Sequence, residues 1–370
     1  MDSEDPIWTR AFALAEQAIG LSDPNPRVGC VIVAADGRTV LAEGHTQAAG
    51  GPHAEAAALQ SARARGIDLR GATAWVTLEP CSHHGRTPPC CDALVAAGLA
   101  GVHIAVGDPN PRVDGRGAAR LLAAGLRVAW AGAAVAERAR ELNIGFFARM
   151  TRGRPWVRLK IAASLDGITA LPDGRSQWIT GEAARIDGHA WRRRAGVVLT
   201  GIGTALADDP RLDVRHLPTA RQPLRAVVDA RLALAPAARL LDGGTPVLLY
   251  AVDPEPRRAA ALRERGAVIV PVPGTAGGRA DLTAVFADLA AREINEVHVE
   301  AGARLNGALL TAGLVDEWLV YLAPALLGSG RAMAAFGPLA ALDERIEADF
   351  VSAMRVGADL RLLARARRPA

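Results

Sequence analysis

The feature that most constrains this fold is a set of side chains between residues 53 and 90 that suits a single metal ion. His53 and Glu55 stand two positions apart, Pro80 and Cys81 follow, and Cys90 comes later. One neutral imidazole and two thiolates would leave the fourth position of a tetrahedral zinc ion open. Two segments of the chain must therefore converge on one point of the fold.

The order of these residues, His-x-Glu then Pro-Cys and a further Cys, is that of zinc-dependent deaminases. Water at the open position would lose a proton near neutral pH and become a nucleophile. Glu55 would not bind the metal; it would carry that proton to the leaving ammonia, as a general base and then as a general acid. The alternative is a closed structural zinc site or no metal, which would leave Glu55 unexplained.

The second thiol departs from the usual C-x-x-C spacing, because eight residues, SHHGRTPP, separate Cys81 from Cys90. We expect them to form a loop before a helix that begins near Cys90. Cys91 is the rival ligand, but it would point about 100° further round that helix. His83 and His84 are rival nitrogen ligands, although a pair in an insert rich in Gly and Pro is better suited to line the mouth of the site.

Composition places the chain among soluble globular proteins, because half of its 370 residues are apolar and 22% are charged. This length suggests two domains, each able to bury its own core. The net charge is +4 and the isoelectric point 9.2, which suits a phosphate-bearing ligand and does not indicate a nucleic-acid surface.

Cysteine usage and the chain ends predict the compartment. Four cysteines in so long a chain, some of them close to a histidine, indicate metal binding in a reducing cytoplasm rather than disulfides. The N-terminus, MDSEDPIWTR, is acidic where a signal peptide would be basic. No apolar run reaches transmembrane length, so we expect no membrane association.

Alternating helices and strands over residues 1–148 predict an α/β/α sandwich with a mixed sheet. Asp5 and Pro6 mark the start of the first helix. The helix from Ala54 places His53 and Glu55 at its N-terminus, where the helix dipole would favour the Glu55 carboxylate. The expected helices are 5–20, 54–66, 90–98, 118–124 and 134–150. The expected strands are 28–33, 39–44, 72–78, 102–108 and 127–130.

Two residues near the first strand have alternative interpretations. Asn25 lies just before this strand, and its amide can donate to and accept from a pyrimidine edge; a simple Asx-turn is the equal alternative. Cys30 lies within the apolar run VGCVIV, so we interpret it as a core thiol rather than a metal ligand.

The polar, Gly- and Pro-broken stretch 149–155 predicts a domain boundary, and residues 154–370 predict a second α/β domain. A helix is expected over 181–194. The expected strands are 156–164, 196–201, 223–230, 246–250, 267–272, 296–302 and 316–324. Open α/β sheets bind their ligands at strand ends, so the polar clusters that follow these strands are candidate site residues.

Three such clusters stand out in the second domain. The sequence from Gly201 to Thr204 follows a strand but fails as a dinucleotide fingerprint, because Leu206 replaces its third glycine. A glycine pair at a strand end can still admit a phosphate closely. The turn from Glu300 to Gly302 would offer backbone N–H groups to an anion. Lys160, near Ser164 and Asp166 at another strand end, could bind a ligand oxygen or simply pair with an acid such as Glu300.

Over essentially its whole length the chain resembles the bifunctional riboflavin-biosynthesis deaminase/reductases. The matching stretches are DPNPRVGCVIV, PHAE and VTLEPCSHHGRTPPCCDAL in the first half, and LKIAASLDGITA, SQWIT, TGIGTALADDPRLDVR and VEAG in the second. The resemblance implies a cytidine-deaminase-like α/β/α sandwich followed by a dihydrofolate-reductase-like α/β domain. It also accounts for the eight-residue gap and favours Cys90 as the ligand.

The resemblance implies two reactions: zinc-dependent hydrolytic deamination of 2,5-diamino-6-(5-phosphoribosylamino)pyrimidin-4-one, then NADPH-dependent reduction of its ribosyl side chain to ribityl. It places Zn²⁺ on His53, Cys81 and Cys90, with Glu55 as the proton shuttle. It places NADPH contacts on Ala162, Trp178, Thr204, Asp208, Ala230 and Gly302. It places substrate contacts on Lys160, Ser176, Arg192, Leu212, Arg215 and Glu300, to which our own interpretation adds Asn25.

The residue types agree with several of these assignments. Arg192 and Arg215 could clamp a 5′-phosphate bidentately, and Trp178 could stack on the cofactor. Arg231 is either a partner for a 2′-phosphate or a solvated loop residue. Ala230 departs from the family, which often has Ser there and so gains a hydroxyl contact to the cofactor.

We therefore expect a cytoplasmic homo-oligomeric enzyme that acts on a small phosphoribosyl pyrimidine, without a nucleic-acid or membrane partner. A nucleic-acid deaminase would need a basic face with exposed aromatic residues, whereas aromatic residues make up only 4% of this chain. A zinc-stabilised binding protein would not explain a glutamate beside an open zinc position.

Overall fold

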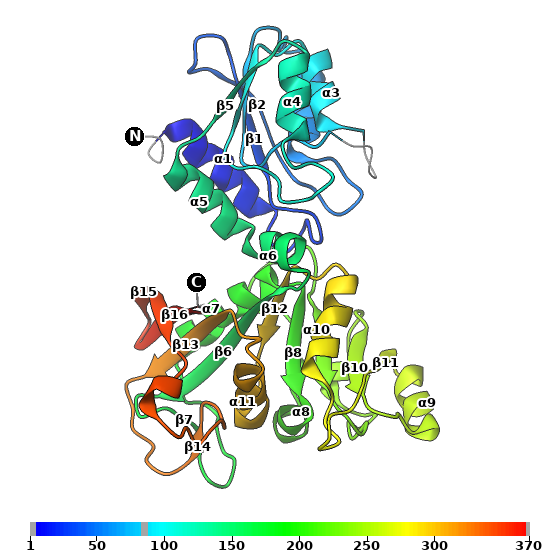
Figure 1. The fold of residues 1–370 in the computed structure, drawn as a ribbon, viewed down its shortest axis with the longest axis vertical. Helices are drawn as coiled ribbons and strands as arrows, with labels where there is room; N and C mark the ends of the chain where they lie inside the picture. Colours follow the sequence, from blue (N-terminus) through cyan, green and yellow to red (C-terminus); the bar gives the residue numbers. More distant parts are fainter. Residues whose placement is uncertain (1–4, 83–87, 368–370) are drawn as a thin grey trace. The chain divides into compact units, whose positions relative to one another are not determined.

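The computed structural model describes residues 5–82 and 88–367 of the chain (Figure 1). The chain forms two compact units, Met1–Gly153 and Arg154–Ala370. Within the described ranges, no helix combines the length and the apolar character that crossing a membrane requires.

The first unit is built on a five-stranded sheet with the strand order β2-β1-β3-β4-β5. Strand β1 is antiparallel to β2 and β3, whereas β3, β4 and β5 are parallel, so the sheet is mixed as predicted. The strands are β1 (Gly29–Val33), β2 (Val40–His45), β3 (Thr73–Val76), β4 (Gly101–Ile104) and β5 (Arg127–Trp130). All of β1, GCVIV, is buried, as is typical of a strand that is covered on both faces.

Helices cover both faces of this sheet, which confirms the predicted sandwich. Helices α1 and α5 contact each other, while α3 contacts both α2 and α4, and Figure 1 shows α1 and α5 on the opposite side of the strands from α3 and α4. The helices are α1 (Pro6–Gln17), α2 (Ala54–Ala64), α3 (Cys90–Ala96), α4 (Arg116–Ala123), α5 (Ala133–Leu142) and α6 (Ile144–Arg152). As predicted, α1 begins after Asp5, whose carboxylate accepts the Ile7 N–H at 2.8 Å.

One glycine determines how closely α2 approaches the sheet. A Cβ atom at Gly44 in β2 would lie 2.3 Å from the carbonyl oxygen of Ala54, the first residue of α2. No side chain fits there, so a glycine is required at this position. Gly44 pairs with Cys30 in β1, and paired residues share a face of the sheet. The N-terminus of α2 is thus held directly against the face that carries Cys30.

The single helix expected over 134–150 is wrong, because it is divided at Asn143 into α5 and α6. The buried Asn143 side chain accepts the Arg27 N–H at 2.7 Å and donates to the Arg27 carbonyl oxygen at 3.0 Å. Local propensity favours a continuous helix, but these bonds to a segment more than a hundred residues away occupy the asparagine and interrupt it.

The second unit is built on a nine-stranded sheet with the order β11-β10-β9-β8-β12-β6-β13-β16-β15. The strands from β11 to β13 in this order are parallel, and β16 and β15 are antiparallel to their neighbours. The parallel strands are β6 (Trp156–Ser164), β8 (Val197–Gly201), β9 (Leu224–Val228), β10 (Val247–Ala251), β11 (Ala267–Pro271), β12 (Glu296–Val299) and β13 (Glu317–Ala323).

The two faces of this sheet differ in polarity. One face packs apolar side chains such as Leu159, Leu199 and Val297 against Phe286 of α10. The other face, near β6 and β12, is polar and is covered by α7. The guanidinium carbon of Arg158 lies 4.4 Å from the centroid of the Trp191 ring of this helix. The helices of this unit are α7 (Glu182–Arg194), α8 (Ile202–Asp208), α9 (Pro256–Glu264), α10 (Leu282–Ala291), α11 (Ala303–Thr311) and the short 3-10 helices η2 (Arg239–Leu241) and η3 (Leu342–Glu344).

Four strands of this unit were not predicted. The C-terminal hairpin of β15 (Ala348–Val356) and β16 (Asp359–Ala366) extends the sheet, and β7 (Ile168–Ala170) pairs with β14 (Arg331–Ala332). Strand β15 is exposed along most of its length, so its sequence lacks the alternation of apolar and polar residues that indicates a half-buried strand.

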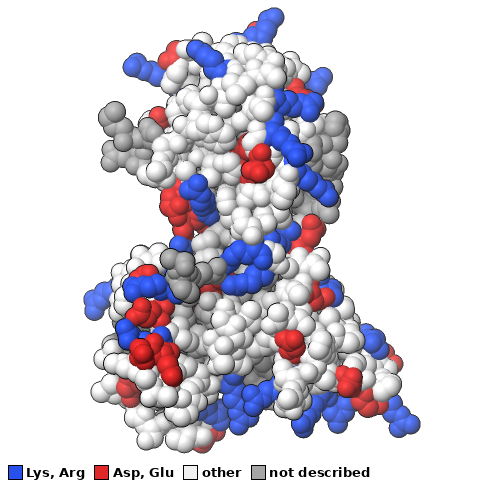
Figure 2. All heavy atoms as spheres, in the orientation of Figure 1, with Lys and Arg blue, Asp and Glu red and all other residues white. Residues whose placement is uncertain are grey.

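The surface carries charges of both signs. On the face drawn in Figure 2, acidic and basic side chains both occur on each unit, with large uncharged areas between them.

Candidate metal centre and reductase site

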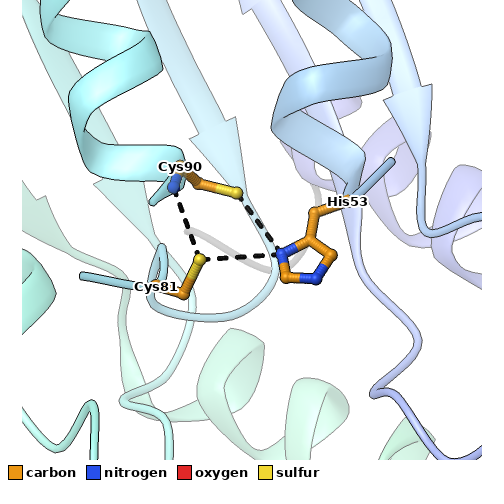
Figure 3. Close-up of side chains that lie close together, drawn as sticks. All are labelled: His53, Cys81 and Cys90. Atoms are coloured by element: carbon orange, nitrogen blue, oxygen red, sulfur yellow. Dashed lines mark hydrogen bonds between the residues drawn. The ribbon is translucent and has the colours of Figure 1, made fainter. Parts of the chain in front are cut away.

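The three predicted metal ligands come from separate places in the first unit and converge in the structure (Figure 3). His53 is the N-cap residue of α2 and has an extended backbone. Cys81 follows the end of β3, and Cys90 is the first residue of α3. Two helix N-termini therefore present a histidine and a cysteine to the same point.

The donor atoms have the spacing that a tetrahedral zinc ion requires. His53 Nδ1 lies 3.6 Å from Cys81 Sγ and 3.4 Å from Cys90 Sγ, and the three ligand atoms all lie within 4.8 Å of one another. Zinc bonds of about 2.3 Å to sulfur and about 2.0 Å to nitrogen, at tetrahedral angles, place the two ligand atoms about 3.5 Å apart. The geometry and the donor set therefore fit zinc.

Hydrogen bonds at this point favour the thiolate form of Cys81. The Cys90 N–H donates to Cys81 Sγ at 3.4 Å. Hydrogen bonding to the Cys90 thiol, and then to His53, lowers the pKa of Cys81 to about 4. Since the thiolate is the form that binds metal, Cys81 is ready to bind a cation at neutral pH.

The other cysteines and histidines considered from the sequence lie elsewhere. Cys91 is buried, and its Sγ lies 3.3 Å from the Pro80 carbonyl oxygen, so it faces away from His53. Burial raises the pKa of Cys91 to about 12. Cys30 is fully buried in the core. His83 and His84 lie outside the described residues.

Glu55 lies in the first turn of α2 with only 4% of its surface exposed. Burial, and then the nearby Cys81 thiolate, raise its pKa to about 7. The backbone N–H at the start of the helix favours the carboxylate, as expected, but the loss of hydration on burial outweighs it. A carboxyl group that titrates near neutral pH is suited to accept a proton and then donate it.

Two carboxyl groups near this site were not singled out from the sequence. Glu79 accepts the backbone N–H groups of Asp108, Gly115 and Ala118 at 3.3, 3.0 and 3.0 Å, and so anchors the segment that leads to Cys81. Asp108 is buried, and burial raises its pKa to about 7. Glu79 stands in the motif EPC, but only the folded chain brings its three N–H partners together.

Asn25 lies in a tight turn before β1. Its N–H donates to the Ser22 carbonyl oxygen at 2.9 Å, and the Ser22 hydroxyl donates to the Asn25 carbonyl oxygen at 3.1 Å. The turn uses backbone atoms of Asn25, so its half-buried side chain is left for other contacts.

In the second unit the structure brings Arg192 and Glu300 together. Arg192 of α7 donates from Nε and Nη2 to the two carboxylate oxygens of Glu300 at 2.5 and 2.8 Å, and from Nη1 to the Asp213 carbonyl oxygen at 2.9 Å. Arg215 donates to the Asp213 carboxylate at 2.6 Å. Both guanidinium groups thus face protein oxygens, and the mostly buried Glu300 carboxylate gains the cationic partner that such a group needs.

Lys160 is half-buried in β6, on the same polar face. Burial lowers the pKa of Lys160, whereas the negative charge of Glu300 raises it. The two side chains therefore interact electrostatically. Ser164 and Asp166 have a different role: the Ser164 hydroxyl donates to Asp166 at 2.5 Å, and Asp166 accepts the Gly328 N–H at 2.7 Å. This pair holds a turn in place.

Two of the predicted cofactor contacts lie close together. Thr204 belongs to α8, and Gly302 is the N-cap residue of α11. A Cβ atom at Gly302 would lie 3.5 Å from Thr204 Oγ1, so these residues meet at the ends of the neighbouring strands β8 and β12. Strand ends are where open α/β sheets bind ligands.

The other predicted contacts lie on separate segments. Trp178 is 66% exposed, and its ring lies beneath the Arg185 guanidinium, whose carbon is 4.6 Å from the ring centroid. Leu212 is buried and has a φ of 54°, which leucine rarely adopts. Ala162 is half-buried in β6, Ser176 half-buried between β7 and α7, Asp208 exposed at the end of α8, and Ala230 half-buried after β9.

A buried ionic network on the polar face was not predicted. Arg158 donates to Glu317 at 2.5 Å and to Glu296 at 2.9 Å, and all three side chains are nearly inaccessible. His298 lies beside Arg158 in the sheet register, because β6 pairs with β12. Each of these residues interrupts an apolar strand, a weak signal that becomes meaningful only when the partner strands are known.

Two protein families match the chain. Residues 1–106 match the zinc-binding region of cytidine and deoxycytidylate deaminases, and residues 155–362 match the RibD C-terminal domain. The first match contains the cluster of His53, Cys81 and Cys90, and the second contains Arg192 and Glu300.

Similar proteins cover nearly the whole chain. Riboflavin biosynthesis protein RibD of Escherichia coli (strain K12) is 44% identical over 370 residues, which covers 95% of this chain and 96% of that protein. RibD of Aquifex aeolicus (strain VF5) is 37% identical and covers 95% of each chain. A solved structure of Acinetobacter baumannii RibD has a TM-score of 0.88 with 38% identity and covers 98% of each chain. The chain therefore belongs to the RibD family, the bifunctional deaminase/reductases of riboflavin biosynthesis.

Proposed function

We propose that this protein carries out two consecutive reactions on one phosphoribosyl pyrimidine. The first is hydrolytic deamination of 2,5-diamino-6-(5-phosphoribosylamino)pyrimidin-4-one, and the second is NADPH-dependent reduction of the ribosyl side chain to ribityl. The observation that carries the proposal is the cluster of His53, Cys81 and Cys90 with the buried Glu55, in a chain that also contains a reductase unit. We assign deamination to residues 1–148 and reduction to 154–370.

A solved relative supports this choice of substrates. A Thermotoga maritima structure, 31% identical with a TM-score of 0.85 and covering 98% of each chain, is titled a diaminohydroxyphosphoribosylaminopyrimidine deaminase/5-amino-6-(5-phosphoribosylamino)uracil reductase. The product of the first named activity is the substrate type of the second. This relation supports deamination before reduction.

In the deaminase site, His53, Cys81 and Cys90 would hold zinc. When bound, zinc supplies Lewis acidity that makes a water molecule acidic near neutral pH. Glu55 accepts the proton of the attacking water and delivers it to the departing amino group, which leaves as ammonia. The raised pKa of Glu55, about 7, supports this exchange of a proton in both directions. Asn25 would bind the pyrimidine edge through its amide.

In the reductase site, NADPH supplies the hydride, so the side chains need only bind and orient the two reactants. We assign substrate contacts to Lys160, Ser176, Arg192, Leu212, Arg215 and Glu300, and NADPH contacts to Ala162, Trp178, Thr204, Asp208, Ala230 and Gly302. The close approach of Thr204 and Gly302 at two neighbouring strand ends supports the second set.

The pairing of Arg192 with Glu300 bears on how the substrate would bind. A substrate phosphate would compete with Glu300 for the Arg192 guanidinium, which donates to both carboxylate oxygens in this structure. Glu300 would then be available to accept hydrogen bonds from ribosyl hydroxyl groups. Arg215, which is exposed, would turn from Asp213 to the same phosphate.

We further propose that the protein is a homo-oligomer in which a second copy covers strand β15. This strand forms an edge of the nine-stranded sheet and presents Phe350, Val351 and Met354, which are 75%, 46% and 46% exposed. An exposed apolar edge strand invites pairing with another chain. A cytoplasmic location is supported by the four cysteines, which are all free thiols.

A single assay tests the proposed function. Zinc-loaded protein is supplied with the diamino-pyrimidinone ribosyl phosphate and NADPH, and ammonia release and NADPH oxidation are recorded together. We expect ammonia first and NADPH consumption after it. Ammonia without NADPH consumption would contradict the reductase assignment, and no ammonia from zinc-loaded protein would contradict the deaminase assignment.

A further inference from the structure

His298 is a fully buried histidine whose place in the fold is unusual. It lies in β12 with none of its surface exposed, two residues before Glu300, and residues two apart in an extended segment point to the same face. Its Nε2 atom lies 3.3 Å from Glu300 Oε1. Because the side chain is inaccessible, it would act on the reductase site through Glu300 rather than by touching the substrate.

Neither ring nitrogen of His298 has a hydrogen-bond partner of good geometry among the residues that the structure describes. Buried polar groups in native proteins are almost always paired, so an unpaired imidazole at full burial calls for an explanation. Glu300 Oε1 is an acceptor within reach, and a small rotation of either side chain would complete the bond.

The surroundings keep His298 neutral. Burial lowers the pKa of its imidazole, and the guanidinium groups of Arg158 and Arg192 lower it further, against the opposing effect of Glu300. A neutral imidazole carries one proton, which can be donated from Nε2 to Glu300. The donor is therefore uncharged, and the Glu300 carboxylate remains the anion of the pair.

The other supports of Glu300 differ in how they would respond to a bound substrate. The Thr200 hydroxyl holds the Glu300 backbone carbonyl at 2.6 Å, which does not orient the carboxylate. Arg192 holds both carboxylate oxygens, but the same guanidinium is assigned to the substrate phosphate. His298 cannot be drawn away in this manner, since it is enclosed by the sheet and α7.

We propose that His298 is a positioning residue of the reductase site, which holds the Glu300 carboxylate in its working orientation through a hydrogen bond from Nε2. The inference rests on the proposed contact of Glu300 with the substrate. The buried polar face thereby gains a role, because the hydrogen bond from His298 to Glu300 would persist when the Arg192 guanidinium also binds a phosphate.

Two matched variants test this role. In His298→Gln the amide nitrogen can take the place of Nε2, whereas in His298→Asn the side chain is one methylene shorter and its amide cannot reach Glu300. Both side chains are neutral amides, so the two variants have similar burial costs. Ammonia release by the same chain is the internal control for protein concentration, because His298 belongs to the other unit, and the KM for NADPH is the control for folding of the reductase unit.

The measurement is the reductase rate with deaminated substrate and NADPH, each varied separately. We expect His298→Asn to lower kcat/KM for the deaminated substrate about tenfold or more, as for other lost supports of a reacting group. The KM for NADPH should be unchanged, and His298→Gln should recover activity to within about threefold of the wild type. In a double-mutant cycle with Glu300→Gln, the His298→Asn effect should largely disappear.

Several outcomes would overturn the proposal. Equal reductase rates in the Gln and Asn variants would show that the donor at Nε2 has no role. A rise in the KM for both reactants, in both variants, would show a structural effect only. If the single variant Glu300→Gln kept wild-type reductase activity, the assignment of Glu300 to the substrate would fail, and the role of His298 with it. If Glu300→Gln lost activity while both His298 variants kept the wild-type rate, the role of His298 would fail and the assignment of Glu300 would stand.

Discussion

His53 and Cys90 are 37 positions apart in the chain, yet His53 Nδ1 lies 3.4 Å from Cys90 Sγ. Each residue stands at the N-terminus of a different helix, His53 as the N-cap of α2 and Cys90 as the first residue of α3. Two helix N-termini therefore bring these two ligand atoms together. The hydrogen bond with Cys81 and burial raise the pKa of Cys90, so at this point it is Cys81 whose thiolate is favoured.

The choice between the adjacent cysteines can be tested by single substitutions. We expect Cys90→Ser to lose bound zinc and ammonia release, because this removes a donor atom beside His53. Cys91→Ser should keep both, because Cys91 Sγ faces the Pro80 and Gly117 carbonyl oxygens at 3.3 and 3.5 Å, to which a hydroxyl can also donate. Zinc content by atomic emission and ammonia release check this, and zinc retention in Cys90→Ser would contradict the ligand assignment.

Substitution of the proton shuttle should separate metal binding from chemistry. Glu55→Gln keeps the size of the side chain but cannot exchange a proton, so we expect full zinc content and a loss of about 10²–10⁴-fold in the rate of deamination. NADPH oxidation with substrate that is already deaminated should be unaffected. Substantial deamination by the zinc-loaded variant would show that another group carries the proton.

The pKa of Asp108 predicts a pH dependence of stability in zinc-free protein. Burial raises the pKa of Asp108 to about 7, above the value of about 3.9 expected in the unfolded chain. Its contribution to stability is therefore present at low pH and is lost as the pH rises from about 4 to about 7. We expect the unfolding temperature of the first unit to fall across this range.

The variant Asp108→Asn isolates that contribution. Asparagine can still accept the Asn110 N–H, which bonds Asp108 at 2.8 Å, but it has no charge to bury. Thermal unfolding with a chelator present, followed from about pH 5 to about pH 7.5, should show a shallower decline in the variant. Parallel curves for the two proteins would mean that Asp108 titrates normally.

The exposed Trp178 should matter for the cofactor and not for stability. Trp178 is 66% exposed, and exposed substitutions usually change stability by less than about 0.5 kcal/mol. A ring contact with the cofactor is worth about 0.5–1.5 kcal/mol, so we expect Trp178→Ala to raise the KM for NADPH by about three- to tenfold. The KM of Trp178→Phe for NADPH should lie between those of the wild type and Trp178→Ala. An unchanged KM in Trp178→Ala would show that this residue does not contact the cofactor.

Much of the first unit could be predicted because its signals are local. Asp5 and Pro6 identify the start of α1, and the apolar run of β1 identifies a strand that is buried on both faces. The spacing of His53, Cys81 and Cys90 predicts a shared cation, since few other arrangements use these residue types in this order. In the second unit β6 was predicted with its observed bounds, 156–164, because it alternates between strongly apolar and polar residues.

The predictions that failed depend on partners distant in sequence. Asn143 interrupts a helix only because its side chain bonds the Arg27 backbone. Strand β15 forms because β16 provides an antiparallel partner, while its own exposed residues follow no strand pattern. The burial that raises the pKa of Glu55 is likewise a property of the packed domain, which the local sequence does not reveal.

The sequence by itself determined which atoms are available: one imidazole, two thiolates and a glutamate in an order that suits hydrolytic zinc chemistry. Only the tertiary structure decided their states and their neighbours. It placed Cys90 rather than Cys91 beside His53, buried Glu55, and placed His298 between Arg158 and Glu300. The physical reason is that ligand identity is a property of residue type, whereas burial and electrostatic partners arise when strands and helices from distant parts of the chain pack together.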